Sequence, residues 1–206
     1  MIELAIEAYG LKDTVRTGWM LRGIRDPESV ADHSWGTALL CLLYAGAEGL
    51  DTDRCLRIAL VHDIAECRVG DIPKRVDPAA QPVTAAEKAR LEQEAIDYLS
   101  ELPGVESVEF ARLWLEYERR GSREALFVRD MNLIDMCLTA LLYERGNRYA
   151  SVDTASNFPD FDRLDEFFAT ASPELSTPTA RTLFSDISSR YESEKQRVRG
   201  ADGPIS

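Results

Sequence analysis

Apolar residues recur along most of the chain at intervals of three and four, the spacing that places them on one face of an α-helix. No stretch combines sustained apolar–polar alternation with the β-branched enrichment that is typical of strands, and no internal repeat is found. We therefore predict an all-α fold, a compact bundle of helices. The expected helices cover about residues 2–10, 29–47, 53–63, 84–99, 105–119, 123–144, 160–170 and 178–196.

Polar residues that cap helix starts mark several of these boundaries. Ser29 is the predicted N-cap of the second helix, and Thr52 or Asp53 of the third. Thr84 with Glu87 three residues later has the spacing of a capping box, in which each side chain bonds the other residue's backbone N–H. The chain from 63 to 84 is predicted to be irregular after its first turn, because it holds several glycine and proline residues.

The chain has 206 residues, enough for one domain with a sizeable core. We predict a single helical domain over residues 1–198, followed by a flexible tail at 199–206. The net charge of −12 argues against binding to a nucleic acid polymer, because such binding depends on basic surface. The longest apolar stretch, TALLCLLYAGA, is too short to span a bilayer. No secretory signal is recognised at the N-terminus, so a cytoplasmic location is expected.

The four cysteines are Cys41, Cys55, Cys67 and Cys137. None of them forms a CxxC pair, and three lie in apolar helical contexts. Buried, reduced thiols are therefore expected rather than disulfides or a zinc–thiolate site.

The only two histidines, His33 and His62, both lie inside amphipathic helical patterns. In LRIALVHDIAECRVGDIPKR, His62 is followed directly by Asp63. Glu66 comes four residues after His62, a spacing that predicts the same helical face for both. Imidazole and carboxylate groups suit one divalent cation such as Mn²⁺, Co²⁺, Fe²⁺, Ni²⁺ or Zn²⁺. Such a cation polarises a phosphoryl oxygen and acidifies water. The residues alone leave open a second interpretation, a solvated His-Asp pair at a helix end.

Three further segments carry a recognisable pattern: ADHSWGTALL, ALVHDIAECRVGDI and LFVRDMNLIDMCLTALLYE. Together they resemble the HD-domain phosphohydrolases, and in particular the 5′-deoxynucleotidase branch. Further matches are RTGW at 16–19, ESV at 28–30, GDI at 70–72 and the pair Tyr143-Glu144. The resemblance covers about residues 10–145 and is specific, because several independent spacings agree.

The resemblance implies an all-helical bundle with one divalent metal that removes the 5′-phosphate from deoxyribonucleoside monophosphates, which makes the chain a phosphoric monoester hydrolase. By position, His33, His62 and Asp63 would be metal ligands. Glu66 would act on the attacking water or the leaving oxygen, and Asp71 would support the catalytic step.

The resemblance also implies the groups that face the nucleotide substrate. Arg16 would lie against the phosphate or the sugar, and Trp19 would pack against the base or the deoxyribose. The phosphate requires cationic donors, and Arg16, Arg22 and Arg68 are the nearest candidates in the sequence.

The chain departs from the family pattern at the fourth metal ligand. The family has an aspartate in a VKxxD context on the late helix, and Asn132 stands at the matching position here. Three outcomes remain open: Asn132 is a weak ligand, Asp130 enters through a local helix distortion, or the protein binds metal and nucleotide without turnover. We favour the first. The third would make the chain a noncatalytic or weakly active nucleotide-binding, regulatory HD protein. Asn132 could also be an ordinary polar residue of the helix surface.

Other apolar features receive ordinary structural interpretations. The stripe through TALLCLLYAG belongs either to the core or to a dimer interface, and a homodimer is expected. Trp35 is expected to lie in the core or in a pocket wall. Trp114 and Tyr117 indicate an ordinary amphipathic helix.

Overall fold

The computed structural model describes residues 1–105, 109–151 and 154–201. Within these ranges the regular elements are helical, apart from isolated bridges, so the predicted all-α fold is confirmed. The helices are α1 (Ile2–Tyr9), α2 (Thr17–Leu21), α3 (Val30–Tyr44), α4 (Thr52–Val61), α5 (Glu66–Val69), α6 (Ala85–Ser100), α7 (Phe110–Glu118), α8 (Arg123–Arg145), α9 (Asp165–Ala171) and α10 (Pro178–Ala201).

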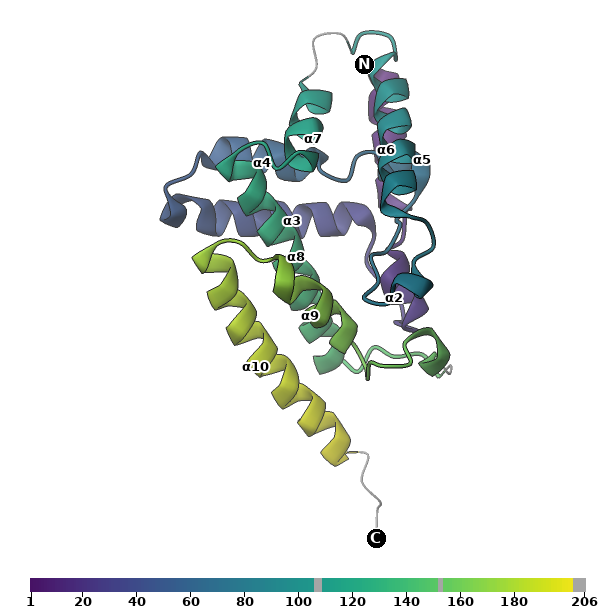
Figure 1. Cartoon of the computed structure of the whole chain (residues 1–206), viewed down its shortest axis with the longest axis vertical. Helices are drawn as coiled ribbons and strands as arrows, with labels where there is room; N and C mark the ends of the chain where they lie inside the picture. The colour runs from purple at the N-terminus through teal and green to yellow at the C-terminus, as the bar shows by residue number, and fades with distance from the viewer. Residues whose placement is uncertain (106–108, 152–153, 202–206) are drawn as a thin grey trace.

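Helix α8 is the centre of the bundle (Figure 1). It packs against α3, α4, α7, α9 and α10. Phe127, Met131, Ile134 and Cys137 on α8 have no exposed surface. A helix that is apolar on most sides has to be enclosed by others, which is why helices surround α8 on several sides.

Two buried carboxylates of α8 connect it to the chain that follows. Asp130 accepts hydrogen bonds from the backbone N–H groups of Ser176 (3.0 Å) and Thr177 (2.7 Å), and from both hydroxyls, directly before α10 begins. Glu144 accepts from Arg163 at 2.6 Å and from the hydroxyl of Tyr149 at 2.5 Å. Because a buried carboxylate is costly without partners, these bonds fix how α10 and the segment before α9 lie on α8.

The predicted helix starts are partly confirmed. Ser29 caps α3 in a complete capping box with Asp32, and Thr84 accepts the backbone N–H of Glu87 at 3.1 Å. Helix α4 begins one residue earlier than expected, because Asp51 is its N-cap and accepts the N–H of Arg54 at 3.1 Å. The carboxylate of Glu87 pairs with Arg90, so the reciprocal bond of the predicted capping box is not formed.

Several other boundaries differ from the prediction. The segment RTGW, which lies outside the expected helices, contains the start of α2, and α9 is shorter than the expected 160–170. Helix α10 continues to Ala201 and so includes the first residues of the expected tail. Residues 106–108 of the expected helix 105–119, and 202–206 of the tail, lie outside the described residues.

The outer side of α3 carries large apolar side chains. Trp35 is 69% exposed, so the expectation that it lies in the core or a pocket wall is wrong. The apolar stripe divides between the two alternatives that the sequence left open, since Leu40 and Cys41 are buried while Leu42 and Leu43 are more than half exposed. In the described part of the chain, no helix has the length and apolar character needed to cross a membrane.

The cysteines behave as expected, since all four are free thiols. Cys41, Cys55 and Cys137 are buried, and Cys67 is partly buried. Burial raises the pKa of Cys55 to about 12, so this thiol stays neutral at physiological pH.

Candidate metal centre and substrate cavity

His33 lies in the first turn of α3, directly after the Ser29 cap, and is 1% exposed. Its Nδ1 lies 2.6 Å from the Oδ2 of Asp135 on α8. Because a carboxylate only accepts, Nδ1 carries the hydrogen and Nε2 keeps its lone pair. Nε2, on the opposite side of the ring from α8, is therefore free to bind a metal ion.

His62 and Asp63 lie in a tight turn rather than inside a helix. Helix α4 ends at Val61, and the next backbone bonds join residues three apart, from Ile64 N–H to the Val61 carbonyl (3.1 Å) and from Glu66 N–H to the Asp63 carbonyl (3.0 Å). The prediction that Glu66 shares a helical face with His62 is therefore wrong, because the two residues belong to different elements. The turn instead brings Glu66 to the same cavity as Asp63.

The two imidazoles face one carboxylate. His62 Nδ1 donates to the carbonyl of Ala59 at 2.7 Å, so its Nε2 also keeps a lone pair. Asp63 Oδ2 lies 3.1 Å from His62 Nε2 and 3.7 Å from His33 Nε2. Both Nε2 atoms are buried, and neither has a hydrogen-bond partner among the described residues.

This arrangement fits a divalent cation. His33, His62 and Asp63 each offer one ligand atom, and these atoms lie within 4.8 Å of one another. Three electron-pair donors that face each other in a buried place repel unless a positive charge lies between them. Two imidazole nitrogens and a carboxylate oxygen are suitable ligands for the borderline cations from Mn²⁺ to Zn²⁺. The ligands that the sequence places far apart thus fit one metal ion.

The same contacts shift the pKa values of this cluster. Burial works against the charge of Asp63, but His62, His33 and Arg16 hold the pKa of its carboxyl well below the usual range. For His62, burial lowers the pKa, and the neighbouring Asp63 carboxylate outweighs this effect and raises it. Asp63 is therefore ionised and available as a ligand at any physiological pH.

Glu66 has the opposite character. It is 5% exposed, and its Oε2 has no hydrogen-bond partner within the described ranges. Burial, followed by repulsion from Asp63 and Asp71, raises its pKa well above the ordinary value. Asp71 is held in place by Thr17, whose N–H donates to Oδ2 (2.5 Å) and whose hydroxyl donates to the Asp71 carbonyl (2.8 Å).

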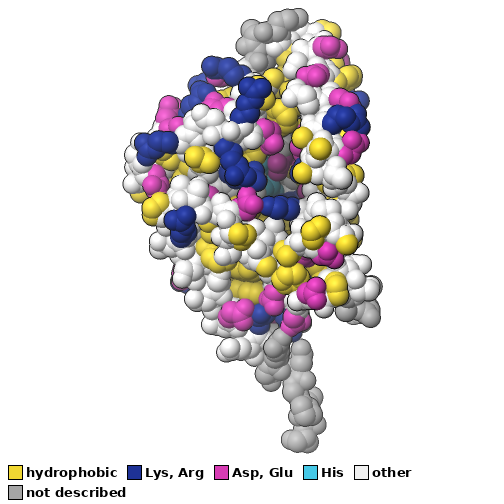
Figure 2. All heavy atoms as spheres, viewed as in Figure 1, with side chains coloured by type: hydrophobic (Ala, Val, Ile, Leu, Met, Phe, Trp, Pro, Cys, Tyr) yellow, Lys and Arg dark blue, Asp and Glu magenta, His cyan; other side chains and the backbone are white. Residues whose placement is uncertain are grey.

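His33, Asp63, Glu66 and Asp71 line one cavity of about 580 Å³, which is large enough for a small organic ligand. Figure 2 shows a hollow in the middle of this face, with histidine at its floor and both basic and acidic side chains around it. Its polar lining comprises Arg16, His33, Asp63, Glu66, Asp71, Lys74, Arg75, Gln81, Lys88, Glu92, Tyr117, Glu118, Arg129, Asn132, Glu166 and Thr170.

Arg16 and Trp19 meet at the same carboxylate. The indole Nε1 of Trp19 donates to Glu28 at 2.9 Å, and the Arg16 guanidinium lies 3.3 Å from the same oxygen. Trp19 is 1% exposed and stacks on Phe167 with ring centroids 4.0 Å apart. Burial disfavours the charge of Arg16, yet Glu28 and then Asp71 raise its pKa, so this cation is permanent.

Asn132 lines the cavity, whereas Asp130 does not. The Asn132 amide donates to the hydroxyl of Tyr117 at 2.7 Å, and the Tyr117 ring meets the His62 ring edge-on at 5.2 Å. Asp130 is 1% exposed and its carboxylate is bound to the residues that precede α10. Within α8 it is therefore Asn132, and not Asp130, that faces the site.

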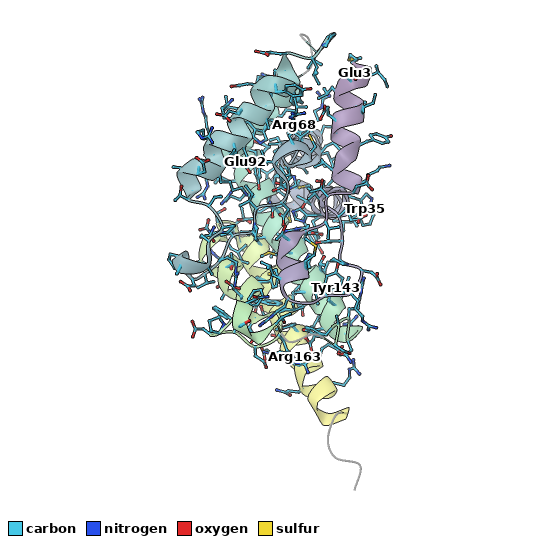
Figure 3. All side chains as sticks on the ribbon, turned by 90° about the vertical axis from the view of Figure 1, so that its right-hand side faces the viewer. Glu3, Trp35, Arg68, Glu92, Tyr143 and Arg163 are labelled. Carbon is cyan, nitrogen blue, oxygen red and sulfur yellow. The ribbon has the colours of Figure 1, made fainter. Side chains whose placement is uncertain are left out.

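Of the three arginines predicted to bind the phosphate, only one lines the cavity. Arg16 lines the cavity, whereas Arg22 donates to the carbonyl of Phe161 (2.6 Å) and lies over Phe158. Arg68 pairs with Glu7 at 3.1 Å and lies over Tyr98, and Figure 3 shows it between α6 and α1. Neither belongs to the cavity lining.

The structure adds cations that the sequence analysis missed. Lys88 on α6 and Arg129 on α8 both line the cavity. Arg129 is one turn before Asn132, so helical spacing could have identified it once Asn132 was chosen. Lys88 had no such signal, because only tertiary packing brings α6 to this site. Tyr117 was also missed, since the pattern of α7 is that of an ordinary amphipathic helix.

Glu92 gives the cavity wall a measurable pH dependence. Burial raises the pKa of Glu92 to about 6, although the nearby Lys88 opposes this shift. Since the folded-state pKa exceeds the ordinary value of 4.5, this group stabilises the fold fully below pH 4.5, and the contribution is lost as pH rises through 6. Between pH 4.5 and pH 8 the loss is about 1–2 kcal/mol.

The variant Glu92→Gln has no such titration. We expect its free energy of unfolding, relative to that of the unaltered chain, to rise by about 1–2 kcal/mol between pH 4.5 and pH 8. Urea unfolding of both proteins with a chelator present measures this difference. A difference that is constant across this range would show that Glu92 does not titrate in this way.

Comparisons with known proteins agree with the geometry. The family model described as HD domain matches residues 8–175. The chain is 42% identical to the human protein named 5′-deoxynucleotidase HDDC2, over 86% of this chain and 79% of that one. It is 39% identical to the Schizosaccharomyces pombe protein named 5′-deoxynucleotidase hdd1, over 66% of this chain and 68% of that one.

A solved structure also shares the fold. The protein PH0347 from Pyrococcus horikoshii OT3 has a TM-score of 0.69 at 29% identity, and the match covers 93% of this chain and 99% of that one. The match to the family model extends over most of the chain and includes His33, His62 and Asp63. This protein belongs to the HD domain family.

Proposed function

We propose that this protein is a divalent-metal-dependent phosphohydrolase that removes the 5′-phosphate from deoxyribonucleoside monophosphates. One observation carries the proposal: two buried imidazole Nε2 atoms and the Asp63 carboxylate face one point at the side of a cavity that also holds Glu66, Asp71 and Arg16. The relatives named 5′-deoxynucleotidase support this substrate class.

His33, His62 and Asp63 are the proposed ligands of one divalent cation, with Asn132 as a weaker fourth ligand through its amide oxygen. Mn²⁺, Co²⁺, Fe²⁺, Ni²⁺ and Zn²⁺ all suit this donor set. When bound, the cation would supply Lewis-acid charge for a phosphoryl oxygen and lower the pKa of water at the site.

Glu66 is the proposed proton-transfer group. Its raised pKa allows the buried carboxyl to hold a proton that it donates to the departing 5′-oxygen as the P–O5′ bond breaks. The water oxygen forms the new bond to phosphorus, so the products are a deoxynucleoside and inorganic phosphate. Asp71, which Thr17 fixes, orients this water.

The cavity offers suitable surroundings for a nucleotide. Arg16, Lys88 and Arg129 bring positive charge for the phosphate. Trp19, Leu133, Met136 and Phe167 form apolar lining for the sugar and the base.

A phosphate-release assay with the four deoxynucleoside monophosphates and Mn²⁺ or Co²⁺ tests the function. We expect turnover by the unaltered chain, loss of both metal and activity in His62→Ala, and retained metal with activity about 10²–10⁴-fold lower in Glu66→Gln. Arg68→Ala is the control, because this side chain lies outside the cavity lining. Full activity in a metal-free His62→Ala protein would refute the proposal.

The variant Asn132→Asp separates the enzyme from the noncatalytic alternative. A carboxylate at this position would add charge next to the cation, so Mn²⁺ should bind at least about 10-fold more tightly. Isothermal titration gives the affinity and the phosphate-release assay gives the turnover. If only the variant hydrolyses nucleotides, the protein as it stands is the nucleotide-binding, regulatory form; turnover by both supports the enzyme.

We further propose that the protein is a cytoplasmic homodimer. The outer side of α3 supports the dimer, because Trp35, Leu42 and Leu43 are each more than half exposed there. We expect light scattering to give twice the chain mass of 23.1 kDa, and Leu42→Glu to yield monomers. Leu60→Glu, at a site on α4 that is also more than half exposed, is the control. A monomeric unaltered chain would contradict the dimer.

A further inference from the structure

Asp135 contacts the proposed metal ligand His33, but none of the roles proposed above belongs to it. It lies on α8 three residues after Asn132, is 7% exposed, and contacts His33 Nδ1 at 2.6 Å. No other hydrogen bond of its side chain is recorded in the described ranges. Glu28, the other carboxylate next to His33, is bound by Arg16 and Trp19.

The backbone of α3 leaves space for this carboxylate. A Cβ atom built on Gly36 would clash with Oδ1 of Asp135 and would lie 2.9 Å from its Cγ, well inside van der Waals contact. Gly36 is one turn after His33 on the same helix, so α3 supplies both the imidazole and the gap through which Asp135 reaches it. Glycine is less favourable than alanine in a helix interior, and the contact has to offset this cost.

The charges around the ligand atoms explain what Asp135 adds. His33, His62 and Asn132 are neutral when they act as ligands, so Asp63 is the one charged member of the proposed set. This leaves a divalent cation half neutralised. A carboxylate hydrogen-bonded to a ligating imidazole makes the ring a stronger donor and fixes which nitrogen is free. Asp135 therefore brings a second negative charge to the metal through His33.

We propose that Asp135 is the positioning residue of His33. Its carboxylate accepts the Nδ1–H hydrogen bond and so directs Nε2 toward the metal. Without being a ligand itself, it also supplies the negative charge that Asn132 lacks. Gly36 leaves the space on α3 that the Asp135 carboxylate occupies. The inference rests on the proposed metal site and deepens it.

Metal titration of the purified full chain tests the proposal without any substrate. After chelation and dialysis, Mn²⁺ is added and its affinity is measured by calorimetry. Asp135→Asn and Gly36→Ala should each weaken binding by about 10–100-fold. In Gly36→Ala both partners remain, and only the space for the carboxylate is lost.

Matched variants separate this role from general destabilisation. Gly46→Ala makes the same change where a Cβ would meet nothing within 4 Å. Glu144→Gln removes another buried, ion-paired carboxylate from the same helix. Both should bind Mn²⁺ as the unaltered chain does, even if Glu144→Gln unfolds at a lower temperature.

The tautomer of His33 gives a second readout that a merely structural role would not change. With only two histidines in the chain, ¹⁵N spectra of the metal-free protein resolve each ring. The unaltered chain should hold its proton on Nδ1, and Asp135→Asn should shift it toward Nε2, because the new amide can donate to Nδ1. Unchanged metal affinity with an unchanged tautomer in Asp135→Asn would overturn the inference.

The role of Asp135 and the proposed hydrolytic function can fail independently of each other. If Mn²⁺ binds and both variants weaken it, the role of Asp135 stands even when no nucleotide is hydrolysed. If the chain hydrolyses nucleotides while both variants bind Mn²⁺ normally, the function stands and the role of Asp135 fails.

Discussion

The structure depends on the burial of carboxylates along one enclosed helix. Asp130, Asp135 and Glu144 all lie on α8, and each is at most 7% exposed. A buried carboxylate is tolerated only where hydrogen-bond donors surround it, so each of the three requires a specific partner segment. Asp130 binds the residues directly before α10, Glu144 binds Arg163, and Asp135 binds His33 on α3. The same requirement that orders the bundle therefore also orients a metal ligand.

The site shows how a protein of net charge −12 holds an anionic substrate next to several acids. Glu28 and Asp71 are hydrogen-bonded to neighbouring groups, and burial raises the pKa of Glu66. Asp63 alone among the proposed ligands carries a charge. With a divalent cation and with Arg16, Lys88 and Arg129, the cavity becomes positive where a phosphate would lie.

Much of the fold and part of the site could be predicted from the sequence. The long helices and the Ser29 cap follow from apolar spacing and local side-chain bonds, which depend on neighbours only a few residues apart. The grouping of His33 with His62 and Asp63 came from the resemblance and not from spacing. The prediction failed where a local rule was extended too far, since a tight turn after Val61 replaces the helix that was expected to align Glu66 with His62.

The sequence by itself determined the helices, the residue types available for metal and phosphate, and the absence of an aspartate at position 132, because all of these are properties of short segments. Only the tertiary structure decided that Trp35 faces outward, that Asp130 binds the residues directly before α10, and that Lys88 and Tyr117 reach the cavity. The same holds for Asp135, whose contact with His33 joins residues 102 positions apart. Such contacts depend on how helices pack against each other, and helical periodicity specifies which face is apolar but not which neighbour covers it.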